Sequence, residues 1–340
     1  MDNTPNTISI DGTDYVRADT PSVCPRAVVQ FSTGAGSAEV AYRAVERHGA
    51  RNVTLMTADT LIEDEDNWRF ATEVHAQLGC EWLRVADGRT PMQLAKAQRF
   101  IPNNRAAHCS RILKRELLRR YLDALFDPAD TIVYLGFDWT EERRLWDACA
   151  AITCGKCKRQ KREPGDPYPL TPCPDHILGR CEQCDTYLPP GAVITAEHVH
   201  PWSPWRLAAP LMDPPYLTKP QILDAMRARG IEPPRLYAEG FSHANCGGGC
   251  VRAGQAAWAH LLQVRPDEYA RWEAEENEVR VHIGKDVSIL TDRRGGSRRP
   301  LTLAAFRERE QADDYDHDDW GSCGCTEDAV QGDLFNQEAS

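Results

Sequence analysis

Short apolar segments alternate with segments of helical periodicity through the first half of the chain. The predicted strands cover 27–31, 53–57, 81–85 and 131–135. The predicted helices cover 38–48, 67–78, 110–125 and the residues from about 140 onward. Strands that alternate with helices in this way form a parallel sheet with helices on both faces. We therefore expect a Rossmann-like α/β fold, whose ligands bind at the carboxyl ends of the strands.

This alternation stops near residue 151. We divide the chain into an N-terminal extension (1–25), an α/β domain (26–151), a cysteine-rich insertion (152–195), a mainly helical C-terminal part with a Cys/Gly-rich turn (196–310) and an acidic tail (311–340). The first residues lack the basic and apolar regions of a secretory signal, and no run approaches the roughly 18 apolar residues that span a membrane. We expect a cytoplasmic protein with no membrane partner.

The charge of the chain is unevenly distributed. The chain holds 51 acidic residues against 40 Lys and Arg, a formal net charge of −11. Nine of the acidic residues, and no Lys or Arg, lie within 311–340. Residues 1–310 are thus close to neutral, with 42 acids against 40 bases. The overall acidity therefore does not argue against a nucleotide or nucleic-acid partner.

Cysteine usage also limits the possible structures. The chain holds 13 cysteines, and an odd number without an export signal argues against a disulfide framework. Eight of them form four closely spaced pairs: Cys154/Cys157, Cys181/Cys184, Cys246/Cys250 and Cys323/Cys325. Pairs at these spacings are typical of metal sites.

The first two pairs are Cys-x-x-Cys motifs with 23 residues between them. Together they supply four thiolates, the ligand set of a closed tetrahedral zinc site with a structural role. We predict a zinc-ribbon-like module at 152–195 that its metal folds. Five Lys and Arg residues lie within 156–162. They form either a solvated loop or a contact to a DNA or RNA backbone.

The loop Ser32-Thr33-Gly34-Ala35-Gly36-Ser37 joins the first predicted strand to the first predicted helix. Its small residues let an anion approach the backbone N–H groups, and the helix N-terminus and the two Ser hydroxyls add donors. The loop therefore predicts a phosphate site, and the alternative is an ordinary strand-to-helix turn. It matches neither the GxxxxGK[ST] loop nor the GxGxxG loop.

Three further motifs follow along the predicted α/β domain. They are Asp59-Thr60 after the second strand, Cys109-Ser110-Arg111-Ile112-Leu113-Lys114 before a helix, and Gly136 followed by Glu141, Arg143 and Arg144. With the glycine-rich loop, their order over roughly 26–150 resembles the PP-loop ATP pyrophosphatase (adenine nucleotide alpha hydrolase) superfamily. Within it, they are similar to the phosphoadenosine phosphosulfate (PAPS) reductase-like branch. The resemblance resumes over 200–310.

This resemblance implies an adenine nucleotide ligand, such as ATP, PAPS or an AMP-like molecule, with or without Mg²⁺. The nucleotide-binding residues that it implies are Ser32, Thr33, Gly34, Gly36, Ser37, Asp59, Arg111 and Gly136. The catalytic residues that it implies are Cys109, Lys114 and Arg144. In these roles the cysteine handles sulfur, and the basic side chains neutralise phosphate or sulfate charge.

The loop departs from the family signature, Ser-Gly-Gly-x-Asp-Ser/Thr, at two positions. Thr33 stands at the first glycine, and Gly36 stands at the aspartate that organises the nucleotide and its magnesium in the family. We therefore expect nucleotide binding. It occurs either in an enzyme that still cleaves ATP or in a catalytically degenerate binder.

The pairs Cys246/Cys250 and Cys323/Cys325 predict a second metal centre. Either these four cysteines ligate one ion, or Cys109 joins Cys246 and Cys250. Three thiolates leave one iron of a 4Fe–4S cluster open for sulfur chemistry, an arrangement similar to the iron–sulfur tRNA-thiolation relatives of the superfamily. The alternatives are a second zinc and no metal.

These features predict an enzyme of sulfur transfer or adenylyl chemistry that uses an adenine nucleotide. One alternative is an enzyme that adenylates or thiolates a base of DNA or RNA, with the basic zinc module as its nucleic-acid contact. The other is a nucleotide-binding protein without catalysis.

Overall fold

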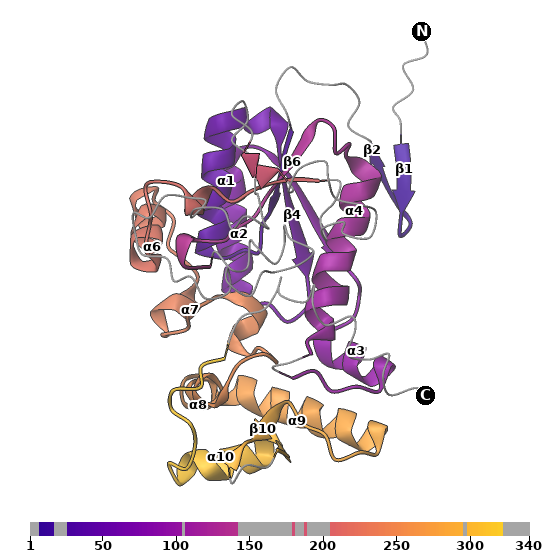
Figure 1. Ribbon diagram of the computed structural model, residues 1–340, viewed down its shortest axis with the longest axis vertical. Coiled ribbons are helices and arrows are strands. Elements are labelled where there is room, and N and C mark those ends of the chain that lie inside the picture. Colours follow the sequence, from indigo (N-terminus) through magenta and orange to yellow (C-terminus); the bar gives the residue numbers. More distant parts are fainter. Residues whose placement is uncertain are drawn as a thin grey trace.

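The computed structural model describes residues 7–16, 26–103, 106–141, 179–180, 187–188, 205–294 and 298–321. An α/β layer lies above a smaller helical lobe in the view of Figure 1. Among the described residues, the α/β layer is built on a sheet of seven strands in the order β5-β4-β3-β6-β9-β8-β7. The strands are β3 (Arg26–Gln30), β4 (Val53–Asp59), β5 (Glu81–Ala86), β6 (Thr131–Tyr134), β7 (Gly179–Arg180), β8 (Tyr187–Leu188) and β9 (Arg206–Ala208).

The five strands from β5 to β9 run parallel, and β8 and β7 extend the sheet antiparallel. β3 lies in the middle, with β4 on one side and β6 on the other. Along the chain, β4 and β5 therefore follow on one side of β3, and β6 and β9 then follow on the other side. This change of direction is the topological switch point of a doubly wound sheet.

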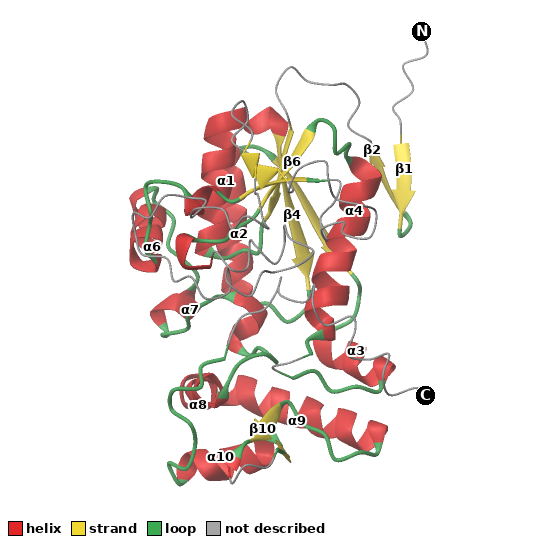
Figure 2. Ribbon diagram, viewed as in Figure 1, coloured by secondary structure: helices red, strands yellow, loops and turns green. Residues whose placement is uncertain are grey.

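Side chains of β3 alternate between two apolar cores. Ala27 and Val29 belong to the core that includes α1, α2 and α6, whereas Val28 belongs to the core that includes α4. These helices are α1 (Ala35–His48), α2 (Glu65–Leu78), α4 (Leu117–Leu125) and α6 (Lys219–Ala228). The predicted parallel sheet with helices on both faces is confirmed (Figure 2).

Several elements differ from the sequence-based expectation. The helix predicted over 110–125 consists of a π-helical stretch, Ser110–Glu116, followed by α4. α1 begins three residues earlier than predicted, inside the glycine-rich loop. Of the helix predicted from about residue 140, the structure describes a 3₁₀ turn at Trp139–Glu141, and the rest lies outside the described residues. The sequence did not indicate α3 (Pro91–Gln98), β9 or α7 (Arg235–Ala238).

The helical lobe has a core of its own. It comprises α8 (Gln255–Val264), α9 (Pro266–Ile283), α10 (Leu303–Gln311) and the hairpin of β10 (Leu290–Asp292) and β11 (Arg299–Leu301). The buried rings of Trp258 and Trp272 meet edge to face, with centroids 5.6 Å apart. The chain from Gln255 to Gln311 is thus mainly helical, whereas β9, earlier in the C-terminal part, belongs to the α/β sheet.

Both ends of the described chain are hydrogen-bonded to the rest of the molecule, the N-terminal end through the side chains of Asp11 and Arg120 and the C-terminal end through backbone groups. β1 (Thr7–Ile10) and β2 (Thr13–Val16) form a separate hairpin. At the start of the acidic tail, Asp319 accepts a hydrogen bond from the Ala256 N–H at 2.9 Å, and Gly321 pairs with Ala253. The four cysteines of the predicted zinc module lie outside the described residues. In the described part of the chain, every helix is too short or too polar to cross a membrane.

Candidate functional site

A cavity of about 420 Å³ lies at the carboxyl ends of β3, β4 and β6. Its walls come from the loop after β3, the end of β4, the loop after β6, the junction of the π-helical stretch with α4, and residues 242–245 between α7 and α8. This place is the topological switch point, where open α/β sheets bind their ligands. We refer to it as the main cavity.

The loop after β3 presents backbone donors to the main cavity. The five loop residues predicted to bind nucleotide all line it: Ser32, Thr33, Gly34, Gly36 and Ser37. α1 begins with Gly34 as its N-cap, which has no side chain to cover the first N–H groups of the helix. These N–H groups and the helix dipole attract an anion. The Ser37 hydroxyl holds the loop in shape, because it donates to the Gly34 carbonyl at 2.9 Å and accepts from the Ser32 N–H at 3.2 Å.

Thr33 gives a second indication of a ligand in the main cavity. Its φ of 60° is in the left-handed region, which glycine adopts freely and a β-branched residue rarely adopts. Its side chain is 1% exposed, and its Oγ1 has no hydrogen-bond partner among the described residues. A buried hydroxyl without a partner is costly. An oxygen atom of a ligand in the main cavity would supply the missing partner.

Gly136 brings the loop after β6 close to the glycine-rich loop. A Cβ atom at this position would lie 3.4 Å from the Cα of Ser37. The lack of a side chain at Gly136 thus allows the two loops to approach, and both line the main cavity.

Lys114 separates the main cavity from a second, smaller one, and lines both. Its Nζ lies 3.5 Å from Glu63 Oε1 and 3.8 Å from Cys246 Sγ. The Glu63 carboxylate also accepts the Cys246 backbone N–H at 2.5 Å. Lys114 belongs to the π-helical stretch, a distortion that is frequent at functional sites.

The second cavity, the thiol cavity, is lined by Cys109, Cys246 and Cys250. The structure thus brings Cys109 to the Cys/Gly-rich turn, in which Cys246 and Gly247 have φ values of 58° and 61°. The buried indole N–H of Trp272, in the same wall, has no acceptor among the described residues.

The thiol cavity does not fit a four-iron cluster as the side chains stand. Its volume of about 20 Å³ has room for about one water molecule. Across the part of the chain that the structure describes, no three His, Cys, Asp or Glu side chains are placed to hold a metal ion. The arrangements that involve Cys323 and Cys325 lie outside the described residues, as do Arg144 and the zinc motifs Cys154, Cys157, Cys181 and Cys184.

Two residues that the resemblance assigned to nucleotide binding do not line the main cavity. The Asp59 carboxylate accepts hydrogen bonds from Arg84 at 2.7 Å and from the Leu61 N–H at 2.8 Å. Arg111 is 45% exposed and pairs with Glu116 at 2.7 Å. Both side chains are engaged in contacts outside the cavity wall.

Other lining residues were not singled out from the sequence, among them Glu63, Arg115, Lys219 and Tyr237. Lys219 is the first residue of α6, and no carboxylate of the described chain pairs with it. The helix dipole disfavours a cation at the N-terminus of a helix. This unfavourable placement is the signal that could have marked Lys219 as a candidate ligand-binding residue. No local pattern marks Tyr237, because only tertiary packing brings α7 to the N-terminus of α1.

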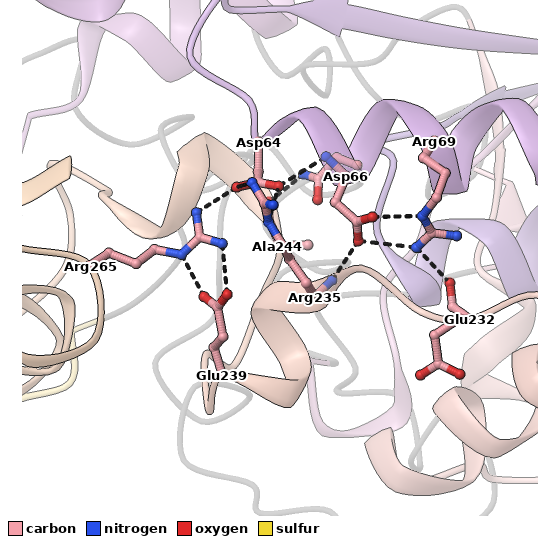
Figure 3. A network of polar contacts seen from close by, with 9 residues as sticks. Asp64, Asp66, Arg69, Glu232, Arg235, Glu239, Ala244 and Arg265 are labelled. Atoms are coloured by element: carbon pink, nitrogen blue, oxygen red, sulfur yellow. Dashed lines mark hydrogen bonds and ion pairs between the residues drawn. The ribbon is translucent and has the colours of Figure 1, made fainter. Parts of the chain in front are cut away.

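An ion-pair network joins α2 to α7 and to the start of α9 (Figure 3). Asp64 is the N-cap of α2, and its carboxylate accepts the Asp66 N–H at 2.9 Å. The same carboxylate pairs with Arg235 at 2.9 Å and with Arg265 at 2.5 Å. Arg265 in turn pairs with Glu239 at 2.5 Å.

This network lies beside the wall of the main cavity. The Asn67 amide, in the first turn of α2, donates to the Ala244 carbonyl at 2.5 Å. Ala244 lines the main cavity, so α2 holds this wall by a direct contact. The ion pairs of Asp64 anchor α7, which precedes this wall in sequence, and the start of α9.

Solved structures similar to this chain include two enzymes. One is phosphoadenylyl-sulfate (PAPS) reductase from Candida auris in a phosphate complex, at 12% identity, 65% coverage of this chain, 80% coverage of that chain and a TM-score of 0.37. The other is NH3-dependent NAD synthetase from Campylobacter jejuni with a nitrate ion, at 13% identity, 78% and 86% coverage and a TM-score of 0.33. No protein-family model and no curated protein matches the chain.

Proposed function

We propose that this chain is a PP-loop, PAPS reductase-like enzyme that binds an adenine nucleotide and uses it in sulfur transfer or adenylyl chemistry. The observation that carries the proposal is the position of Lys114, which lines both the main cavity and the thiol cavity. A phosphate group in the main cavity and a cysteine sulfur in the thiol cavity would both lie beside the Lys114 ammonium group.

The main cavity suits a nucleotide in size and in the distribution of polar groups. Its volume of about 420 Å³ is within the usual range for small-molecule sites. The N-terminus of α1 and the side chain of Lys219 supply positive charge at one side. Phe31, Met56 and Phe137 supply apolar surface on which a base could pack. These features support a ligand with an anionic end and an aromatic end.

The thiol cavity would supply the sulfur-handling groups. The ammonium group of Lys114 lies 3.8 Å from Cys246 Sγ, within reach of the sulfur, and a thiolate is the nucleophile in sulfur chemistry. Glu63 fixes both partners, since its carboxylate contacts the Lys114 ammonium and the Cys246 N–H. Cys109 and Cys250 would provide further thiols within the same cavity.

Metal ions take separate places in this proposal. Asp138 and Glu141 line the main cavity, and their carboxylates are the hard oxygen ligands that Mg²⁺ accepts beside phosphates. We also propose structural zinc at Cys154, Cys157, Cys181 and Cys184, which metal analysis of the purified protein would test. Since the thiol cavity does not fit a 4Fe–4S cluster as it stands, no step is assigned to a cluster or a second zinc there.

The test is calorimetric titration of the full chain with AMP, ATP, PAPS and adenosine. We expect binding of the phosphorylated ligands, and we expect Lys114→Met to weaken AMP binding by about tenfold, because a charge-assisted hydrogen bond is lost. Lys285→Met, which removes an exposed lysine, is the matched control and should bind AMP like the wild type. Unchanged AMP affinity in Lys114→Met would show that Lys114 does not serve the nucleotide.

The protein titrated with ATP also distinguishes an enzyme from a nucleotide-binding protein without catalysis. Gly36 lines the main cavity where the family has its aspartate, so this wall lacks one carboxylate. Release of pyrophosphate from ATP would support an enzyme, and tight AMP binding without turnover would support a binder. The nucleic-acid alternative depends on the basic residues at 156–162, which lie outside the described residues, and it stays a prediction.

A further inference from the structure

The hydroxyl group of Tyr237 lies across the N-terminus of α1. Its Oη accepts the backbone N–H of Ala35, the first residue of α1, at 3.3 Å. A Cβ atom on Gly34 would lie 3.1 Å from the same oxygen. Because Gly34 has no side chain, the Tyr237 hydroxyl can reach the N-terminus of α1. The backbone N–H groups that could bind an anion in the main cavity lie at the same helix end.

The hydrogen atom of this hydroxyl is available to a ligand. A phenol group donates one hydrogen bond and accepts others, and Tyr237 here acts only as an acceptor. Among the described residues, no acceptor faces its O–H. Since Tyr237 lines the main cavity, the acceptor that is missing can be an oxygen atom of the ligand.

Lys219 accompanies Tyr237 on the same side of the main cavity. Its Nζ lies 5.9 Å from the centre of the Tyr237 ring. Two donors from the C-terminal half of the chain thus flank the N-terminus of α1. In the wall of the same cavity, the buried Oγ1 of Thr33 has no partner in the described chain, which independently indicates a ligand oxygen in this cavity.

The position of Tyr237 is set by ion pairs rather than by the ligand. α7 carries Arg235, whose guanidinium pairs with Asp64 at 2.9 Å and whose N–H donates to Asp66 at 2.7 Å. The hydroxyl therefore stands at the helix end before any ligand binds, which reduces the entropy cost of forming the contact.

We propose that Tyr237 and Lys219 are ligand-contact residues for a tetrahedral oxyanion, the phosphate or sulfate group of the nucleotide. In the complex, Tyr237 accepts the Ala35 N–H and donates its own O–H to the anion, and Lys219 supplies the countercharge. This inference rests on the proposed nucleotide-binding function. It adds that the C-terminal half of the chain completes a phosphate site that the glycine-rich loop only begins.

The test compares Tyr237→Phe with Tyr42→Phe, which removes a hydroxyl that joins α1 to α2 instead of α1 to α7. Tyr42 lies on α1, outside the main cavity, and donates to Gln77 at 2.7 Å. Calorimetric titrations use AMP, inorganic phosphate, inorganic sulfate and adenosine. We expect Tyr237→Phe to weaken AMP binding about tenfold and to leave adenosine binding within twofold, because a hydrogen bond to a charged group is lost. Tyr42→Phe should match the wild type for every ligand.

Each outcome decides between interpretations. If Tyr237→Phe binds AMP more tightly than the wild type, the hydroxyl blocks the anion site. If both proteins bind AMP equally, the hydroxyl makes no contact with the ligand. Either result overturns the proposal. If the wild type binds none of the ligands, the proposed function fails first. The two inorganic ions separate a phosphate from a sulfate preference.

A second variant keeps the test decisive if Tyr237→Phe is poorly folded. Lys219→Met should lower AMP affinity by about tenfold and should reduce the salt dependence of binding, whereas adenosine binding stays the same. Lys285→Met is its control. AMP affinity that is the same in Lys219→Met and Lys285→Met would contradict the role of Lys219.

Discussion

At the scale of single residues, Asp64 shows how a buried carboxylate stays charged. Its side chain is 4% exposed, and burial by itself would raise its pKa. The hydrogen bonds from Arg235 and Arg265, with that from the Asp66 N–H, outweigh burial and hold the pKa of Asp64 below its usual value. A carboxyl whose pKa is depressed by folding stabilises the folded state above its unfolded pKa of about 3.9. That stabilisation is lost as the pH falls through the folded value.

We expect Asp64→Asn to lower the free energy of unfolding by about 2 kcal/mol at pH 7. The effect is smaller than for a fully buried pair, because Arg235 is half-exposed. Urea unfolding at several pH values measures it. The difference between wild type and variant should shrink as the pH falls below about 4.

The control is Asp224→Asn, because the Asp224 side chain is 73% exposed and pairs with Arg227 on the surface. This variant should change stability by less than about 0.5 kcal/mol. A difference between wild type and Asp64→Asn that stays constant from pH 7 to pH 3 would refute the assignment.

Glu276 is the opposite case, a buried carboxyl whose pKa the fold raises. Burial is the main cause of its raised pKa, although its oxygens accept the N–H groups of Ile289 at 2.8 Å and Leu303 at 2.7 Å. These bonds join α9 to the β10–β11 hairpin and to the start of α10. Glu276 is therefore a structural residue of the lobe and not part of the ligand site.

At the scale of secondary-structure elements, local hydrophobic patterns predicted most of the sheet. β3, β4 and β6 are short, mostly buried runs, whereas β5 at the sheet edge is largely exposed, and all four were expected within two residues of their observed bounds. β9 was missed because it has three residues and pairs only with β6 and β8, strands distant in the sequence. A pattern this short carries too little information without its partners.

The candidate site shows the same division between local and tertiary information. The glycine-rich loop and the Cys246/Cys250 pair could be named from the sequence because small residues and spaced thiols are local signals, whereas Cys109, Lys114 and Gly136 were named from the resemblance to a family. Tyr237 and Glu63 could not, since their positions depend on how α7 and the Cys/Gly-rich turn pack against the sheet. Asp59 could be named, yet its pairing with Arg84, a residue of the neighbouring strand, could not be foreseen.

The π-helical stretch is the element on which the position of Lys114 depends. A π-helical turn holds more residues than an α-helical turn, so removal of one residue should restore α-helical geometry. We expect deletion of Arg111 to turn Lys114 away from both cavities and to weaken AMP binding as much as Lys114→Met does. Titration calorimetry measures it.

Arg111→Ala is the control for the lost side chain, which is exposed and pairs with Glu116. It should bind AMP like the wild type. If the deletion variant keeps its thermal stability within a few degrees and also keeps full AMP affinity, the π-helical stretch does not position Lys114 for the ligand.

At the scale of the whole molecule, the main cavity is assembled from distant parts of the chain. The α/β layer supplies the glycine-rich loop and the strand ends, and residues 219–245 supply Lys219, Tyr237 and the wall around Ala244. The helical lobe adds Trp272 to the thiol cavity. Ion pairs of Asp64 and the Asn67–Ala244 contact hold these parts together. The proposed nucleotide and thiol chemistry would therefore depend on one packed arrangement.

The measurement that tests the central claim most directly is a crystal structure of the protein grown with AMP. We predict the phosphate at the N-terminus of α1, with its oxygens about 2.7–3.2 Å from the N–H groups of Gly36 and Ser37. Lys114 should then stand between the nucleotide and Cys246. AMP bound elsewhere, or bound in the main cavity with its phosphate turned away from α1, would contradict the account.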